Sequence, residues 1–151
     1  NLKYFKTRHM KVKTRIIDKS IKTPPLQYAK NGDAGIDLTA TSIWYDENRN
    51  VCYGTNRAFE IPKGYVGLVF PRSSNAKKDL LLSNSVGVID SGYRGEVTFK
   101  FKPVLHSVHT YSIGDRIGQI IIMPYHQIEF QEVDELSETD RGNSGFGSTG
   151  V

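Results

Sequence analysis

The sequence predicts an all-β domain, because short stretches of alternating residues recur along the chain and turn-forming residues separate them. Residues 12–16 (VKTRI) alternate in this way, as a half-buried strand does. Later stretches are rich in β-branched and aromatic residues, with turn residues at intervals of roughly 8–12 residues, a spacing typical of β-sandwiches. At 151 residues, the chain can bury one core, while two would be cramped.

The expected strands run through most of the chain. They cover residues 12–16, 35–38, 58–61, 65–70, 96–102, 110–113 and 116–123. Pro62 and Gly64 favour a turn between two of them, because proline presets φ and glycine accepts a positive φ. One short helix is expected at residues 75–81, where Ser73 and Ser74 can cap the open N–H groups.

The two ends of the chain depart from this pattern. His9-Met10 is a dipeptide that a common cloning junction leaves behind, so we expect residues 1–9 to be a cloning remnant outside the fold. Residues 134–140 are acidic, and residues 141–150 are rich in glycine. Such a composition buries little apolar surface. We therefore expect one β domain over residues 10–133 and a flexible arm over residues 134–151.

Charge and composition narrow the possible functions. The net charge is +4, but residues 1–9 carry Lys3, Lys6 and Arg8 and no acid. The remainder is close to neutral, so binding of nucleic acid through its phosphates is not expected. No apolar stretch approaches the roughly 18 residues of a membrane-spanning helix. The single cysteine, Cys52, cannot form an internal disulfide, which favours a reducing, cytoplasmic location.

A first candidate site comprises Arg72, Ser73 and Ser74, between an apolar strand and the expected helix. A guanidinium, two hydroxyls and open N–H groups suit a phosphate. The alternative interpretation is that the serines only cap the helix and Arg72 pairs with a carboxylate. Asp37, in another apolar strand, has two interpretations as well. It either pairs with an arginine or helps to hold Mg²⁺ through water.

A second candidate site lies at residues 87–95, which we expect to form a hairpin. Its Ser-Gly turn would place Asp90 and Tyr93 close together on facing strands. A carboxylate beside an aromatic ring suits a general base with a substrate platform, and Asn84 adds a donor and an acceptor. Aspartate and tyrosine are also ordinary turn and strand residues.

A third candidate site is the glycine-rich end of the chain. Phe146 can stack on a base, while Arg141 and Ser148 can bind phosphates, so the segment suits a nucleotide lid. It lacks the GK[ST] sequence of a P-loop. The alternative is an ordinary disordered terminus.

Five motifs now stand in a fixed order along the chain. They are AGIDLTA (34–40), PRSS (71–74), GVIDSGYRGEV (87–97), GDRIGQI (114–120) and RGNSGFGSTG (141–150). In order and spacing they closely resemble the five motifs of the homotrimeric all-β dUTPases, the deoxyuridine triphosphate nucleotidohydrolases. The resemblance implies a jelly-roll-like β-sandwich or barrel with one short helix, whose C-terminal arm is exchanged in a trimer. It also implies hydrolysis of dUTP to dUMP and pyrophosphate with Mg²⁺, which keeps uracil out of DNA and supplies dUMP for thymidylate synthesis.

The resemblance also implies a role for each candidate residue. Asp90 would orient and activate the attacking water, Tyr93 would lie under the deoxyribose, and Asp37 would act through metal-bound water. The other residues fall into a uracil-binding group (Asn84, Gly87, Val88, Ile89, Thr98), a phosphate-binding group (Arg72, Ser73, Ser74, Gln119) and a lid (Arg141, Phe146, Gly147, Ser148).

Two alternative functions remain. A dCTP deaminase of the same fold would need a glutamate general base near the pyrimidine, where this chain has Asp90 and Tyr93. A dUTP-sensing member that binds a regulatory protein is the second. Residues 41–55 match none of the five motifs and are the candidate surface for such a partner. Gly118 stands where the family often has alanine, a difference that we expect to matter little.

Overall fold

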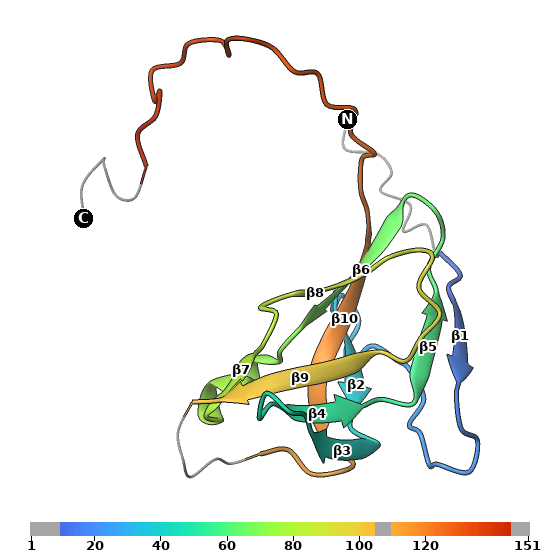
Figure 1. Cartoon of the computed structure of the whole chain (residues 1–151). Coiled ribbons are helices and arrows are strands. Elements are labelled where there is room, and N and C mark those ends of the chain that lie inside the picture. The colour runs from blue at the N-terminus through green and yellow to red at the C-terminus, as the bar shows by residue number, and fades with distance from the viewer. Residues whose placement is uncertain (1–9, 105–109, 146–151) are drawn as a thin grey trace.

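The computed structural model describes residues 10–104 and 110–145 of the chain. These residues form two four-stranded antiparallel sheets and a two-stranded ribbon (Figure 1). The first sheet has the strand order β2-β10-β6-β8, the second has β3-β4-β9-β7, and the ribbon pairs β1 with β5. The expected all-β fold is confirmed. No helix in the described residues has the length and apolar character that crossing a membrane requires.

From β6 to β10 the strands alternate between the two four-stranded sheets. Their bounds are β1 (Lys13–Ile16), β2 (Ile36–Thr39), β3 (Ser42–Tyr45), β4 (Val51–Gly54), β5 (Arg57–Glu60), β6 (Tyr65–Phe70), β7 (Leu80–Leu82), β8 (Gly87–Ile89), β9 (Thr98–Pro103) and β10 (Arg116–Pro124). The nine-residue β10 lies between β2 and β6. It therefore brings residues of β2 and β6, far apart in sequence, to its two edges.

One core joins the two four-stranded sheets. Its buried side chains include Leu38, Val69, Ile117 and Ile120 from the first sheet and Val51, Tyr53, Leu80, Leu82, Phe99 and Phe101 from the second. The ring of Tyr53 meets Phe101 and Tyr111 edge to face, with centroids 6.0 and 5.9 Å apart, a favoured aromatic arrangement. The Tyr53 hydroxyl oxygen also accepts the N–H of Tyr111 at 2.9 Å. The rings thus fix the loop before β10 on the second sheet.

The expected helix is shorter and lies earlier than the sequence indicates. A 3-10 helix, η1 (Ser73–Lys77), is present, with Arg72 as its N-cap residue and no side-chain capping hydrogen bond. Ser73 and Ser74 therefore lie within the helix and do not cap it. The predicted second half is wrong because Leu80 and Leu82 are buried as alternate residues of β7, which pairs with β9.

The strand expected at residues 110–113 is also wrong. The backbone N–H of Ser112 donates to the Asp115 carboxylate, and that of Asp115 donates to the Ser112 carbonyl. These bonds close a turn in place of a sheet ladder. Tyr111 is buried, so the apolar pattern of this stretch reflects an aromatic anchor in the core.

Residues 41–55, which match none of the sequence motifs, contain the β3–β4 hairpin. β3 pairs with β4, and β4 pairs with β9. All four residues of β4 are buried, so the segment contributes directly to the core. Ile43, Trp44 and Tyr45 of β3 are exposed. The role of this surface in binding a regulatory partner stays a prediction.

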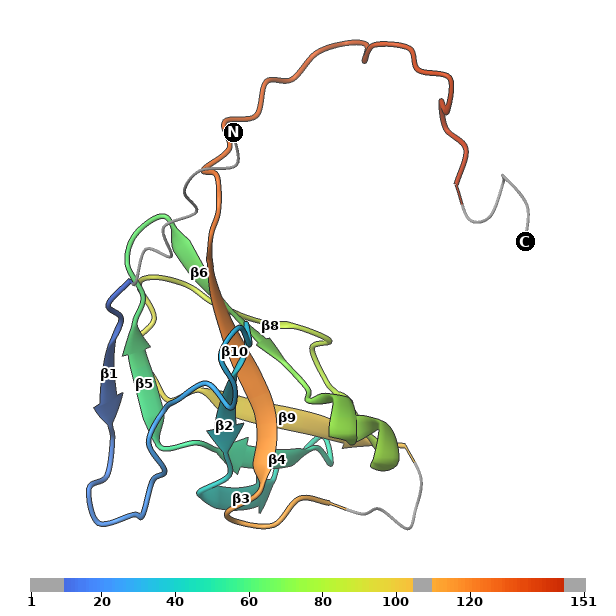
Figure 2. The ribbon, with the colours of Figure 1, turned by 180° about the vertical axis from the view of Figure 1, so that it is seen from behind.

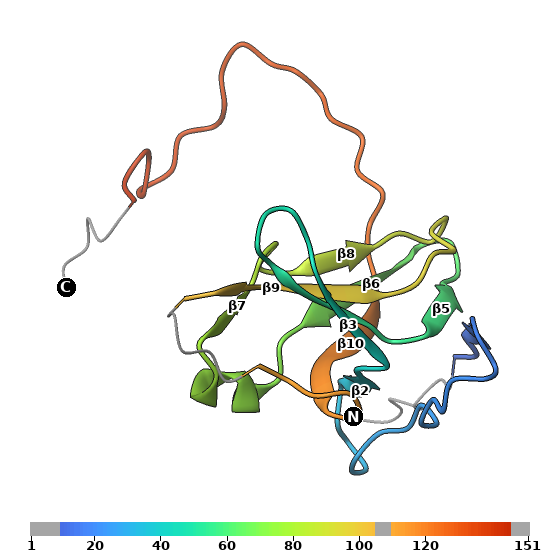
Figure 3. The same cartoon turned by 60° about the horizontal axis from the view of Figure 1, so that its bottom comes forward.

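The C-terminal arm leaves the sheets before the predicted boundary at residue 134. β10 ends at Pro124, and the N–H of Tyr125 donates to the carbonyl of Gly64. Residues 126–145 contain no strand, and they run away from the sheets in every view (Figure 1, Figure 2 and Figure 3). Ile128 and Phe130 are 67% and 88% exposed. In one chain these apolar side chains lack the cover that such residues normally have.

Candidate active site

The phosphate-binding group predicted from the sequence gathers where β2, β10 and β6 lie side by side. Gln119 of β10 pairs with Asp37 of β2 on one edge and with Phe70 of β6 on the other. Arg72 follows β6, and its Nε donates to Asp37 Oδ1 at 2.8 Å. Asp37, Arg72, Ser73 and Gln119 line a pocket of about 340 Å³. Residues from three distant motifs therefore share one concave site.

Two local contacts fix the Gln119 amide in this pocket. Its Nε2 donates to the Pro71 carbonyl at 3.1 Å. Its Oε1 lies against Gly35, where any Cβ would overlap it. The absence of a side chain at Gly35 therefore leaves room for the amide. Ser74 adds an exposed hydroxyl, which accepts a hydrogen bond from Arg72 Nη1 at 3.2 Å.

Asp37 forms ion pairs with two arginines. Oδ1 accepts from Arg72, and Oδ2 accepts from Arg116 at 3.0 Å. The ion-pair interpretation of this carboxylate is thus observed, and its contact with metal-bound water stays a prediction. Arg116 is a member of the cluster that the sequence analysis missed. Its place beside Gln119 depends on an irregularity in β10 that strand alternation alone does not reveal.

The donor set of this site suits a metal that arrives with a phosphate ligand. In residues 10–104 and 110–145 no three acidic, histidine or cysteine side chains converge as a metal cage would require. Mg²⁺ usually keeps several waters and is bound by one or two carboxylates together with substrate phosphates. Two carboxylates, those of Asp33 and Asp37, line the pocket, and this number fits that mode.

The second candidate site is a turn between two different sheets, so the expected hairpin with facing strands is wrong. β8 pairs with β6, whereas β9 pairs with β4 and β7. The turn itself is present, because the N–H of Tyr93 donates to the Asp90 carbonyl at 3.0 Å. It leaves the Asp90 side chain exposed. Within the described residues, no protein hydrogen bond occupies the Asp90 carboxylate.

β8 is an edge strand, and this position suits recognition by its backbone. Among the strands that the structure describes, it pairs with β6 alone, so the N–H and C=O groups along its other side have no strand partner there. Val88 is 61% exposed, while Gly87 and Ile89 are half-buried. Asn84 is exposed just before the strand. Thr98 lies in the other sheet, at the start of β9, where it pairs with Gly54.

One chain keeps the two candidate sites apart. Ile89, next to Asp90, pairs with Gly67 near the start of β6, whereas Arg72 follows the end of that strand. At about 3.3 Å per residue, the five steps from Gly67 to Arg72 span roughly 16 Å. Arg141 lies on the exposed arm, where its Nε donates to the Ser144 carbonyl at 3.1 Å. Phe146, Gly147 and Ser148 lie outside the described residues, as does the cloning remnant expected at residues 1–9.

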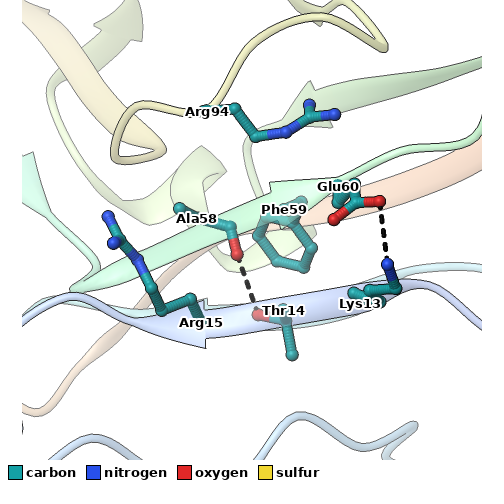
Figure 4. Close-up of a pocket in the computed structure, with 7 residues that line it drawn as sticks. All are labelled: Lys13, Thr14, Arg15, Ala58, Phe59, Glu60 and Arg94. Atoms are coloured by element: carbon teal, nitrogen blue, oxygen red, sulfur yellow. Dashed lines mark hydrogen bonds and ion pairs between the residues drawn. The ribbon is translucent and has the colours of Figure 1, made fainter.

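A larger pocket, of about 440 Å³, lies between β1, β5 and the turn after Tyr93 (Figure 4). Lys13 pairs with Glu60 at 3.1 Å across its floor, and Thr14 donates to the Ala58 carbonyl. Arg94 faces them from the opposite side. None of the candidate residues predicted from the sequence lines this pocket, so its size does not make it the reactive site.

Comparison with known proteins identifies the chemistry. A family model described as dUTPase matches residues 20–150. The chain is 40% identical over 147 residues to the deoxyuridine 5'-triphosphate nucleotidohydrolase of Finegoldia magna, which covers 92% of this chain and 99% of that protein. It is 44% identical over 128 residues to the enzyme of that name from Tropheryma whipplei (strain Twist), covering 82% and 87%. A Staphylococcus bacteriophage 80alpha dUTPase solved with dUpNHpp superposes with a TM-score of 0.78 at 26% identity, covering 93% and 99%.

Proposed function

We propose a mechanism on the premise that this chain belongs to the dUTPase family and hydrolyses dUTP to dUMP and pyrophosphate. The observation that carries the activity is the match with curated nucleotidohydrolases over nearly the whole of both chains. Neither the deaminase nor the dUTP-sensing alternative is favoured by these relatives. The assignment of roles to individual residues, given below, is our proposal.

Asp90 is the general base in this mechanism. Its carboxylate is exposed at a turn whose closing hydrogen bond uses only backbone atoms, so it is free to accept a proton from water. The activated water attacks phosphorus, and the bond between the α- and β-phosphoryl groups breaks to release pyrophosphate. Phosphoanhydride hydrolysis depends mainly on positioning and charge stabilisation, so one well-placed carboxylate suffices for the proton transfer.

Arg72, Ser73, Ser74 and Gln119 bind the phosphate chain in this proposal. When bound, Mg²⁺ would neutralise phosphate charge, with Asp37 holding it through water. The guanidinium and the amide are both fixed by neighbours, so little ordering is needed when a substrate arrives. This preorganisation supports their assignment as the phosphate side of the site.

The edge of β8 and Asn84 bind uracil in this proposal, and Tyr93 excludes the wrong sugar. Uracil presents an acceptor, a donor and an acceptor, and outward backbone groups of an edge strand can pair with such a pattern. Cytosine would leave some of those groups unpaired. Sites that depend on such hydrogen bonds discriminate against the wrong substrate by a factor of about 10⁴–10⁵. Thr98 would contribute backbone from the start of β9. The ring of Tyr93 would clash with a ribose 2′-hydroxyl.

The active form in this proposal is a homotrimer with shared sites. Two features support it: the roughly 16 Å between Arg72 and Gly67, which pairs with Ile89 next to Asp90, and the uncovered Ile128 and Phe130 of the arm. A neighbouring chain would supply the missing half of each site. The arm of a further chain would bring Arg141, Phe146, Gly147 and Ser148 over the bound nucleotide.

The experiment that tests this function is pyrophosphate release from dUTP, dCTP, dTTP and UTP in the presence of Mg²⁺. We expect rapid release from dUTP alone. Ammonia release from dCTP would support the deaminase and overturn the hydrolase. Binding of dUTP without turnover would support the sensing alternative.

Asp90→Asn should abolish turnover while dUTP still binds. The amide has nearly the same size and the turn depends on backbone bonds, so only the base is lost. The measurements are kcat and the dissociation constant for dUpNHpp, for which the parent protein is the control. Substantial remaining kcat would contradict the role of Asp90.

A further inference from the structure

A β-bulge in β10 decides which face of the sheet Arg116 occupies. Gln119 pairs with Asp37, and Gly118 pairs with Leu38. The next residue of β2, Thr39, pairs with Arg116 and not with Ile117, so Ile117 is an extra residue in β10. In a regular strand, Arg116 would face away from Gln119, because successive side chains point to opposite faces. The extra residue reverses this parity, as bulges near functional sites often do. Arg116 therefore shares the face of Asp37 and Gln119.

The consequence is a carboxylate held between two guanidiniums. Asp37 Oδ1 pairs with Arg72 Nε at 2.8 Å, and Oδ2 pairs with Arg116 Nη1 at 3.0 Å. The cluster therefore carries an excess of one positive charge beside the pocket. Arg72 also donates from Nη1 to Ser74. Within the described residues its Nη2 has no protein partner, so this nitrogen can bind a phosphate oxygen.

We propose that Arg116 is the counter-ion of Asp37, and that it offsets this carboxylate so that the positive charge of Arg72 can act on the triphosphate. Without Arg116, Asp37 and Arg72 form a neutral pair, and the charge of this cluster beside the pocket, which Asp33 also lines, falls by one. Arg116 is a positioning residue, since it acts through Asp37 and needs no contact with the substrate. This inference rests on the proposed phosphate side of the site and adds a residue to it.

The test compares two nucleotides on the full-length protein by calorimetry, with EDTA present so that any role of Asp37 toward metal is silent. dUpNHpp carries the complete triphosphate, and dUMP lacks the β- and γ-phosphates. We expect Arg116→Gln to weaken dUpNHpp binding about tenfold or more and to leave dUMP binding nearly unchanged. Arg116→Lys keeps the charge and should recover most of the affinity.

The double variant Asp37→Asn with Arg116→Gln gives the sharper result. In the double variant no Asp37 carboxylate offsets the positive charge of Arg72, so dUpNHpp binding should return toward the parent value. Asp37→Asn alone should strengthen it, which tests the proposal even where Arg116→Gln fails to fold. A structural role for Arg116 would predict equal losses for both nucleotides and no recovery, and that outcome overturns the inference.

The parent protein separates this inference from the proposed function. A parent that binds dUpNHpp no more tightly than dUMP would overturn the phosphate site and the role of Arg116 with it. If the parent prefers dUpNHpp and the Arg116→Gln variant binds dUpNHpp as tightly as the parent does, only the role of Arg116 is overturned.

Discussion

At the scale of single residues, Tyr93 is positioned by its immediate neighbours. Its hydroxyl donates to the Glu96 carbonyl at 3.0 Å, and its ring lies against Gly95, where any Cβ would overlap it. We expect Tyr93→Ala to lower the ratio of kcat/KM for dUTP over UTP while the ratio for dUTP over dCTP is kept. Tyr93→Phe retains the ring and serves as the control. Loss of dCTP rejection with an unchanged sugar preference would mean that Tyr93 has another role.

Gly118 is a residue at which the sequence-based expectation is wrong. A Cβ there would overlap the Phe99 ring and lie 2.9 Å from the Phe70 carbonyl oxygen, so alanine is not a neutral replacement in this chain. Adding a methyl group to a well-packed core typically costs about 1–3 kcal/mol of stability. Gly118→Ala should therefore lower the free energy of unfolding by about 2 kcal/mol. Urea denaturation measures the change. Gly92→Ala, where a Cβ meets nothing within 4 Å, is the matched control and should lose much less.

The motifs identify most candidate side chains, but not the contacts that set their geometry. Arg72, Asp37 and Gln119 belong to separate motifs, and their meeting in one pocket follows from the antiparallel pairing of β2, β10 and β6. The position of Arg116 was beyond sequence reasoning. One extra residue reverses the parity of a strand, and the sequence of β10 carries no mark of where that residue lies.

At the scale of elements, the β3–β4 hairpin is held by one carboxylate. Asp46 accepts hydrogen bonds from the side chain and the backbone N–H of Asn50 and from the N–H of Asn48, and it pairs with Lys100. The amide side chain of Asn50, then its backbone N–H, and to a lesser extent Lys100 hold the pKa of Asp46 well below its usual range. The ionised carboxylate therefore organises the turn before β4.

Asp46→Asn should lower the melting temperature at neutral pH, and the difference should shrink in acid. A depressed folded-state pKa contributes stability that is fully present above the unfolded pKa of about 3.9 and is lost progressively as the pH falls from there through the folded-state pKa. Melting curves at about pH 7 and about pH 3 measure the effect. Glu47→Gln, at the neighbouring exposed acid, is the control. A difference that persists unchanged in acid would show that the charge of Asp46 is not the cause.

The elements differ in how well their patterns predict them. β6 and β10 contain long runs of branched apolar residues, and the sequence locates both. β4 is buried at every position, so it lacks the alternation that marks a half-buried strand. The sequence pattern assigns Leu80 and Leu81, the first two residues of β7, to a helix, because leucine suits either structure. Pairing with β9 makes this segment a strand, and the two strands are distant in sequence, so local patterns do not reveal the contact.

At the scale of the whole molecule, the arm is the element least explained by one chain. Of the residues between Ile120 and residue 145, none belongs to the buried core cluster, although Ile122 packs against it. Residues 126–145 contain no strand and are nearly all exposed. Little burial then offsets the entropy of ordering them. We therefore expect other chains to order the proximal half of the arm, which contains Ile128 and Phe130, and substrate to order the distal half, which contains the proposed lid.

Deleting residues 142–151 should leave the trimer and its melting temperature nearly unchanged but reduce kcat severely. The described part of the deleted segment, residues 142–145, contains no residue of the core. The deletion does remove the proposed lid that excludes water when the nucleotide is bound. Sedimentation should give three times the chain mass in both cases, where the chain mass is 17.0 kDa for the parent and smaller by ten residues for the deletion. A monomeric parent with full activity would contradict the shared-site architecture.

The proximal half of the arm provides the matched comparison. Ile128→Ser and Phe130→Ser change side chains that are uncovered in one chain. If neighbouring chains bury them, these variants should weaken the trimer and leave its residual activity per trimer largely intact, the reverse of the deletion. Limited proteolysis distinguishes the two halves further, because cleavage after Arg141 should be rapid in the free protein and slow with dUpNHpp and Mg²⁺. Equal protection in both states would mean that the distal arm is a fixed strap, since a lid must open to admit the nucleotide that it covers.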